Sequence, residues 1–264
     1  MNLSLQSKRA LVGGSSQGIG LASAIELADL GAEVTLLARS PERLEKAVKA
    51  LPKLKASQQH DYLVADFTQP DALRATIDQH LAATGRQYHI LVNNTGGPPG
   101  GPITEADTAA FLQAYQMHLA CNQHLAQALL PGMTALGYGR IINIISTSVK
   151  IPIPGLGVSN TTRGAVAAWA KTWANEVAAH GITVNNVLPG MTDTERLRSL
   201  ISQWAANRSI SEADMSEQLK AQIPAGRIAE PAEVAHAVAF LASPAASYLT
   251  GINLPVDGGR TGSL

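Results

Sequence analysis

Short runs of consecutive apolar residues recur along the whole chain and alternate with longer segments of helical length. The runs that we predict as strands span residues 9–12, 33–37, 62–65, 90–92, 140–145, 182–187 and 252–254. Strands that are apolar on successive positions are typical of a parallel sheet with both faces covered. The segments that we predict as helices include residues 18–30, 41–50, 70–84, 106–133, 160–180 and 231–242. Such repeated strand–helix–strand units predict an α/β fold of Rossmann type, a doubly wound parallel sheet of about seven strands flanked by helices on both faces.

Size and charge narrow the possible functions. The 264 residues are enough for one large core and contain no linker or internal repeat, so we predict one domain over residues 1–264. The 20 basic side chains equal the 20 acidic ones, which argues against a nucleic-acid partner. No run reaches the ~20 apolar residues of a membrane span, so we expect no membrane partner either. The single cysteine, Cys121, and the absence of a secretory pattern favour the cytoplasm.

A glycine-rich turn follows the first predicted strand and opens the first predicted helix. Glycines let such a turn approach a pyrophosphate closely, and the helix start offers free N–H groups and a positive dipole end. A glycine pattern alone is weak evidence, but between a strand and a helix it is a strong indication of a dinucleotide site. The residues that we predict to bind the cofactor here are Gly14, Ser16, Gln17, Gly18, Ile19 and Gly20.

The end of the second predicted strand bears on which nicotinamide cofactor is bound. Sites selective for NAD place an acid there, which hydrogen-bonds the ribose 2′-hydroxyl and repels a 2′-phosphate. This chain has Ala38 followed by Arg39, whose guanidinium could pair with a 2′-phosphate. The alternative is that Arg39 is a solvated residue at a loop edge. We therefore predict NADP as the cofactor, with NAD as the less favoured choice.

The glycine spacing resembles that of the short-chain dehydrogenase/reductase family, and the resemblance covers nearly the whole chain. The C-terminal stretch from Gly226 to Gly259 is similar to that of the 3-oxoacyl-[acyl-carrier-protein] reductases, whereas Gly13 stands where the family usually has threonine. The resemblance implies a mobile substrate lid over residues 191–223 and a homo-oligomer, either a dimer or a homotetramer. The further cofactor contacts that it implies are Asp66, Phe67, Asn93, Thr95, Gly96, Pro189, Gly190 and Thr194.

The catalytic positions of the family are altered in this chain. Family members use a serine, a tyrosine, a lysine and a helix asparagine to hold a carbonyl against the nicotinamide and to donate a proton. Ser146 matches the serine, but Ser159 stands at the tyrosine position and Arg163 at the lysine position. The asparagine position is His118. The resemblance thus implies a catalytic set in which three of the four residues have been replaced.

These replacements affect proton transfer more than cofactor binding. The hydroxyl of Ser159 ionises far above neutral pH, so it can hydrogen-bond a substrate oxygen but is a poor proton source. Arg163 keeps the positive charge and could bind the nicotinamide ribose, but arginine does not deprotonate and cannot relay a proton. His118 has a side chain that titrates near neutrality and could supply the missing proton. It could equally be a packed histidine with its nitrogens satisfied.

Two functional hypotheses follow from this pattern. The first is an NADP(H)-dependent oxidoreductase that acts on a carbonyl or alcohol substrate, for example a 3-oxoacyl thioester, with a non-standard proton donor; reduction of an activated C=C bond is a further option. The second is a catalytically silent or weak nucleotide-binding homologue that serves as a sensor or as a subunit partner. The seven histidines show no metal-ligand spacing, so we predict no metal site.

Overall fold

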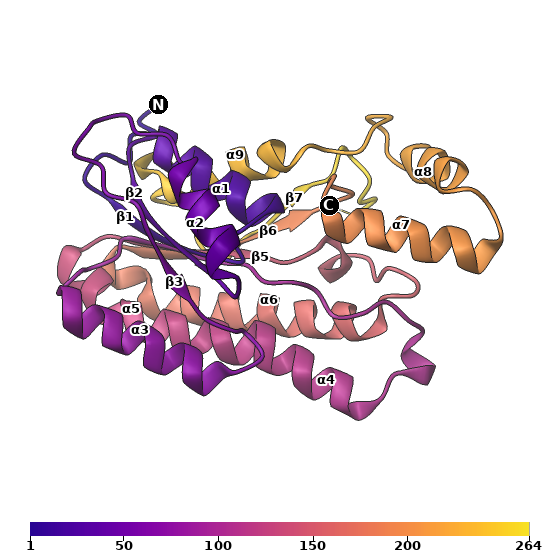
Figure 1. Cartoon of the computed structure of the whole chain (residues 1–264), viewed down its shortest axis with the longest axis horizontal. Helices are drawn as coiled ribbons and strands as arrows, with labels where there is room; N and C mark the ends of the chain where they lie inside the picture. The colour runs from indigo at the N-terminus through magenta and orange to yellow at the C-terminus, as the bar shows by residue number, and fades with distance from the viewer. Residues whose placement is uncertain (264) are drawn as a thin grey trace.

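The computed structural model describes residues 1–263, which contain one sheet of seven parallel strands (Figure 1). In chain order the strands are β1 (Arg9–Gly13), β2 (Glu33–Ala38), β3 (Asp61–Val64), β4 (Ile90–Asn93), β5 (Gly139–Ile144), β6 (Ile182–Pro189) and β7 (Asn253–Val256). Their order across the sheet is β3-β2-β1-β4-β5-β6-β7. The predicted doubly wound Rossmann fold is therefore confirmed.

Helices cover both faces of this sheet. One apolar core joins the sheet to α1, α2 and α9, and a second core joins the opposite face to α3, α5 and α6. The helices are α1 (Gly18–Asp29), α2 (Pro41–Lys49), α3 (Pro70–Thr84), α4 (Thr108–Tyr115), α5 (Cys121–Leu136), α6 (Gly157–Val177), α7 (Glu195–Arg208), α8 (Glu212–Lys220) and α9 (Pro231–Ala242). Among residues 1–263, none of these helices combines the length and apolar character that crossing a bilayer requires.

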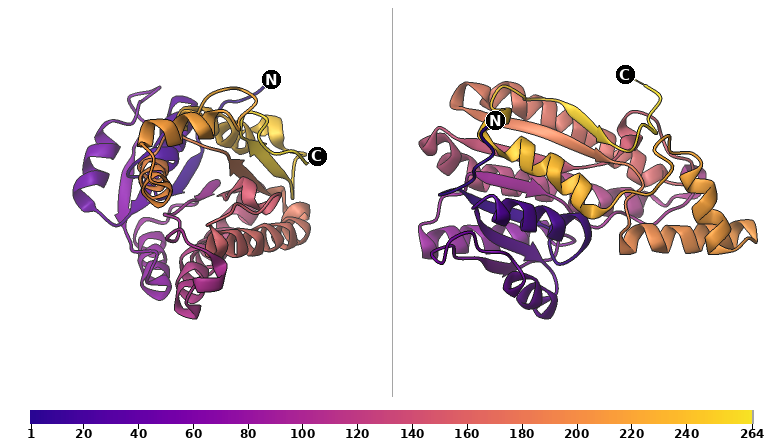
Figure 2. Two further views of the ribbon diagram at one scale, coloured as in Figure 1. Left: turned by 90° about the vertical axis from the view of Figure 1, so that its right-hand side faces the viewer. Right: turned by 90° about the horizontal axis from the view of Figure 1, so that it is seen from above.

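The structure departs from the predicted helices over residues 106–133, and it contains two further helices within residues 191–223. The segment predicted as one helix over 106–133 is divided, because a π-helical turn at Gln116–Ala120 separates α4 from α5. The segment predicted as a lid, residues 191–223, contains α7 and α8. These two helices extend past the carboxyl ends of the strands (Figure 2) and pack on each other through a small apolar cluster that includes Ile201 and Met215. The segment predicted as a lid is thus a helical pair outside the two main cores.

A ladder of asparagine side chains crosses four strands inside the sheet. Asn93 of β4 donates to Asn143 of β5, Asn143 donates to Asn186 of β6, and Asn186 donates to Asn253 of β7, each at 2.8 Å from Nδ2 to Oδ1. The strand register places the four residues side by side. A buried amide is costly unless it is hydrogen-bonded, and here each amide pairs with the next one. The ladder therefore fixes the four strands against each other beside the site described below.

His89, just before β4, links stability to pH. Its side chain is 8% exposed and its Nδ1 accepts a hydrogen bond of 3.1 Å from the backbone N–H of Arg9, so the folded chain requires neutral imidazole. Burial, and then the charges of Lys8 and Arg9, lower the pKa of His89 to about 4. In the unfolded chain histidine binds a proton below ~6.5. The stabilisation from neutral His89 is thus fully present above pH ~6.5 and is lost as the pH falls from there to about 4.

We therefore expect His89→Asn to flatten the decline of stability in acid, because the asparagine Oδ1 can accept the Arg9 N–H without titrating. Over this window His89 contributes a slope of about 1.4 kcal/mol per pH unit, or about 3 kcal/mol in total. Urea unfolding of both proteins at several pH values between 4.5 and 7 measures the difference. Parallel stability curves for the wild type and the variant would contradict the assignment.

Candidate functional site

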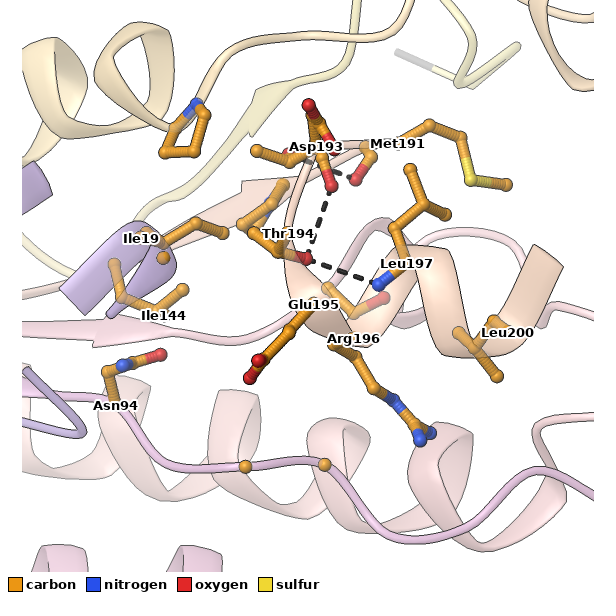
Figure 3. Close-up of a pocket in the computed structure, with 18 of the residues that line it drawn as sticks. Ile19, Asn94, Ile144, Met191, Asp193, Thr194, Glu195, Arg196, Leu197 and Leu200 are labelled. Atoms are coloured by element: carbon orange, nitrogen blue, oxygen red, sulfur yellow. Dashed lines mark hydrogen bonds between the residues drawn. The ribbon is translucent and has the colours of Figure 1, made fainter. Parts of the chain in front are cut away.

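A pocket of about 680 Å³ opens at the carboxyl ends of the central strands, beside the start of α7 (Figure 3). It lies where β1 has β2 on one side and β4 on the other, so that the chain leaves neighbouring strands in opposite directions. Such a switch point is where open α/β sheets bind their ligands. The wall of the pocket runs from the glycine-rich turn at Gly14 to Ser146 and on to α7. Part of the predicted cofactor positions and three of the four predicted catalytic positions thus border a single space.

The glycine-rich turn has the backbone that a phosphate-binding loop needs. Gly14 and Gly18 adopt positive φ values of 55° and 57°, which favour glycine. A Cβ on Gly20 would lie 2.3 Å from the carbonyl oxygen of Gly14, so only glycine lets α1 start this close to the turn. Gly14, Gln17, Gly18 and Ile19 line the pocket, with the N-terminus of α1 directed at it. A dinucleotide pyrophosphate fits this geometry, since unpaired N–H groups and the helix dipole favour an anion there.

The loop after β4 is tied to the glycine-rich turn. Asn94 Nδ2 donates to the carbonyl oxygens of Gly13, at 3.2 Å, and of Gly14, at 3.3 Å. Thr95 and Gly96 follow and line the pocket, whereas the predicted cofactor residue Asn93 lies beneath it in the asparagine ladder. Asn94 therefore joins the two halves of the site, a role that the sequence reasoning did not assign to it.

The positions predicted to contact the adenosine end lie outside this pocket. Arg39 is exposed just after β2. Asp66 accepts a hydrogen bond of 2.9 Å from the backbone N–H of Thr68, and Phe67 is buried beside Gly13. All three follow strands on the β1–β2–β3 half of the sheet, where the adenosine half of a dinucleotide binds in this type of fold. At the other end, Pro189, Gly190 and Thr194, which we predict to contact the cofactor, line the pocket.

Three of the four predicted catalytic residues border the pocket. Ser146 follows β5, and its Oγ accepts a hydrogen bond of 3.1 Å from the backbone N–H of Ser148. Ser159 and Arg163 lie one turn apart on α6 and share its pocket face. Arg163 is only 9% exposed, and its Nη1 donates to the carbonyl oxygen of Ile144 at 2.8 Å. Burial, and then the charge of Arg196, lower the pKa of Arg163 to about 10, so the guanidinium remains charged at neutral pH.

His118 occupies a different environment from these three. It lies in the π-helical turn between α4 and α5, is 2% exposed, and falls outside the pocket lining. Burial, and then the charge of Arg163, hold the pKa of His118 well below its ordinary value, with a backbone hydrogen bond to Gly96 acting in the opposite direction. The imidazole is therefore neutral at pH 7 and offers at most a weakly acidic N–H. π-Helical turns are frequent next to functional sites, and this one places His118 near Arg163 and Gly96.

Arg196 is a site residue that the sequence reasoning did not single out. It lies in the first turn of α7, lines the pocket, and donates from Nη2 to the carbonyl oxygen of Pro98 in the glycine- and proline-rich loop. A cation in the first turn of a helix opposes the helix dipole. That unfavourable position, two residues after the Thr194 cap, was the signal available in the sequence. Figure 3 shows Glu195 and Arg196 extending from the start of α7 toward the loop below it.

Glu195 connects the start of α7 to the glycine-rich turn. Gln17 donates from Nε2 to Glu195 Oε2 at 2.6 Å, and Arg43 of α2 donates to Gln17 Oε1. Thr194 Cγ2 also lies 3.4 Å from the position that a Cβ on Gly18 would take. The start of α7 therefore contacts both the glycine-rich turn and the loop after β4. Among residues 1–263, no group of three or more histidine, cysteine or acidic side chains is arranged to hold a metal ion.

Comparison with known proteins gives consistent similarities over nearly the full chain. A family model described as enoyl-(acyl carrier protein) reductase matches residues 14–261. The 3-oxoacyl-[acyl-carrier-protein] reductase of Pseudomonas aeruginosa is 36% identical over 261 residues, which cover 97% of this chain and 98% of that protein. Gluconate 5-dehydrogenase of Gluconobacter oxydans is 34% identical over 266 residues, with coverage of 99% and 97%. The crystal structure of L-sorbose reductase from Gluconobacter frateurii, complexed with NADPH and L-sorbose, covers 100% of both chains with a TM-score of 0.92 and 31% identity.

Proposed function

The chain belongs to the short-chain dehydrogenase/reductase family, and we propose that it is an NADP(H)-dependent oxidoreductase that interconverts a carbonyl and a hydroxyl group. One observation carries the proposal. A single pocket joins the glycine-rich turn to the hydroxyls of Ser146 and Ser159 and to the guanidinium of Arg163. The residues that would hold the cofactor and the groups that can hold a carbonyl oxygen therefore line one space.

The cofactor assignment rests on this chain's own residues. Gly14, Gly18 and the start of α1 form a cradle that side chains would fill, and an anionic pyrophosphate suits it. The NADPH in the sorbose reductase structure supports the same choice. When bound, the nicotinamide would supply or accept the hydride.

Three residues of the protein would act on the substrate oxygen. The Ser146 Oγ already accepts an N–H, which leaves its own O–H free to donate to the substrate oxygen, and Ser159 can donate a second bond. The Arg163 guanidinium stabilises negative charge that develops on that oxygen, and burial strengthens the interaction. None of these groups gives up a proton readily near neutral pH. We propose that water completes the protonation, which makes turnover slow compared with a tyrosine-dependent enzyme.

The substrate class is tested by single-turnover oxidation of NADPH. The relatives suggest 3-oxoacyl thioesters and keto sugars as the first candidates, and simple ketones and quinones complete the panel. We expect NADPH to bind, which intrinsic fluorescence reports, and at least one carbonyl class to oxidise it. Tight NADPH binding without oxidation by any carbonyl would favour the catalytically silent alternative, for which the replacement of the tyrosine by Ser159 is the supporting observation.

We expect Arg39→Ala to reduce the preference for NADPH over NADH. A charge-assisted hydrogen bond to the 2′-phosphate is worth about 1.5–3 kcal/mol, so the ratio of the two dissociation constants should change by about 10- to 100-fold. Titration with both cofactors measures it. Lys46→Ala removes the same charge from an exposed position on α2 and serves as the control. An unchanged ratio in Arg39→Ala would remove the basis for assigning Arg39 to the 2′-phosphate.

A further inference from the structure

Two guanidinium groups from different elements meet at one point of the pocket wall. That point is Gly97, in the loop after β4. A Cβ on Gly97 would lie 3.8 Å from Arg163 Nη2, 3.7 Å from Arg196 Nε and 3.9 Å from Arg196 Nη2. All three residues line the pocket. An atom placed at this position would therefore touch both cations, one from α6 and one from the lid helix α7.

The acidic side chains of the pocket are engaged elsewhere. Asp193 accepts a hydrogen bond of 2.6 Å from Arg198, and Glu195 accepts one from Gln17. Among residues 1–263, the ion pairs involve neither Arg163 nor Arg196. Charges withdrawn from water are normally paired, so two adjacent cations at a pocket wall without a carboxylate indicate that this part of the wall binds an anionic ligand.

One nitrogen of each guanidinium already donates a hydrogen bond to a backbone carbonyl oxygen. Arg163 Nη1 donates to Ile144 and Arg196 Nη2 donates to Pro98, which fixes the direction of both side chains. In Arg163, the buried Nε has no hydrogen-bond partner within the described chain, and Nη2 is the atom nearest to Gly97. Each arginine thus has further N–H groups beside Gly97 that can donate to a ligand. Two fixed guanidinium forks suit the paired oxygens of a carboxylate.

We propose that Arg163 and Arg196 bind a carboxylate of the substrate, so that the protein acts on an oxo acid or the corresponding hydroxy acid. This inference rests on the proposed function, because it places the reacting carbonyl near Ser146 and Ser159. An oxyanion at this point has a second conceivable source, a phosphate of the cofactor. The two sources differ in what Arg196 should affect, namely substrate binding in the first case and NADPH binding in the second.

The experiment compares free acids with their methyl esters, which differ chiefly in the charge. The probes are 3-oxobutanoate and 4-oxopentanoate, each with its ester, titrated by calorimetry into the protein loaded with NADP⁺, in which no reduction can occur. Oxidation of NADPH with the same four compounds is measured in parallel. We expect at least one acid to bind about tenfold or more tightly than its ester.

Arg196→Gln should abolish that preference for the acid and leave NADPH affinity unchanged. Arg208→Gln removes the same charge from the last turn of α7, away from the pocket, and should retain the preference. Equal binding of acids and esters in the wild type overturns the proposal, as does a loss of NADPH affinity in Arg196→Gln, which would assign the anion to the cofactor.

Failure of this inference can be distinguished from failure of the proposed function. If the esters oxidise NADPH as fast as the acids and bind equally well, the oxidoreductase assignment stands and the carboxylate site is wrong. If the acids bind preferentially through Arg196 but no compound oxidises NADPH, the anion site stands and the proposed activity is wrong.

Discussion

Introducing Ser159→Tyr together with Arg163→Lys is expected to raise the single-turnover rate of NADPH oxidation by a neutral ketone by about 10²-fold or more, because proton donation by a positioned side chain contributes ~10²–10⁴-fold. The pair recreates the tyrosine and lysine that the family resemblance implies at these positions. A neighbouring ammonium lowers a phenol pKa of ~10 toward neutrality, which a serine hydroxyl cannot approach. Both positions border the pocket, so the new phenol would face the space that Ser146 also borders.

The matched control is Ser159→Phe with Arg163→Lys, which has nearly the same bulk without the hydroxyl. A neutral ketone is used because Arg163 is also proposed to bind a substrate carboxylate, and its loss would otherwise obscure the result. The pH dependence of the rate should then show a group that must be protonated, in the tyrosine variant alone. Equal rates for the tyrosine and phenylalanine variants would show that proton donation does not limit the reaction, and would contradict our account of Ser159.

The sheet and its helices were largely predictable from the sequence because they depend on local pattern. Consecutive apolar residues marked β1, β4, β5 and β6 to within one or two residues, since these strands are buried on both faces. The glycine-rich turn was equally clear, because only a backbone without Cβ atoms fits between Gly14 and Gly20. The family assignment followed from the same motifs.

The division of the predicted helix 106–133 could not be read from the sequence. A π-helical turn adds one residue to a turn, but it leaves the polar and apolar pattern of the neighbouring turns nearly unchanged. The extra residue at Gln116–Ala120 changes where His118 lies, and His118 is buried near Arg163 but outside the pocket lining. Spacing along an ideal helix therefore could not decide whether His118 reaches a substrate.

The site itself was predictable only where its residues follow strand ends or share one helix face. Ser146 follows β5, and Ser159 and Arg163 are four residues apart on α6, so the positions converge by geometry. Arg196 could not be placed in this way. Its position depends on the path of residues 191–223 back over the pocket and on its contact with Pro98, which are tertiary features.

The asparagine ladder is a second feature that the sequence did not reveal, and its loss should have a large effect on stability. We expect Asn143→Ala to lower the free energy of unfolding by about 3–5 kcal/mol, because each buried polar group left without a partner costs about 1–3 kcal/mol and a small cavity adds to this. The substitution leaves two buried polar groups without a hydrogen-bond partner. Asn93 Nδ2 loses its acceptor and Asn186 Oδ1 loses its donor, both in the interior of the sheet.

Urea unfolding of Asn143→Ala measures this loss, with Asn175→Ala on the exposed side of α6 as the control that should change stability little. At the β4 end of the ladder, one amide oxygen lacks a partner within residues 1–263 even before the substitution. Asn93 Oδ1 is buried without a hydrogen-bond partner in the described chain. No protein donor among the described residues thus compensates Asn93 at that end when its bond to Asn143 is lost. A loss below about 1 kcal/mol would mean that water or side-chain rotation replaces the missing amide, and that the ladder does not fix the strands that carry the site.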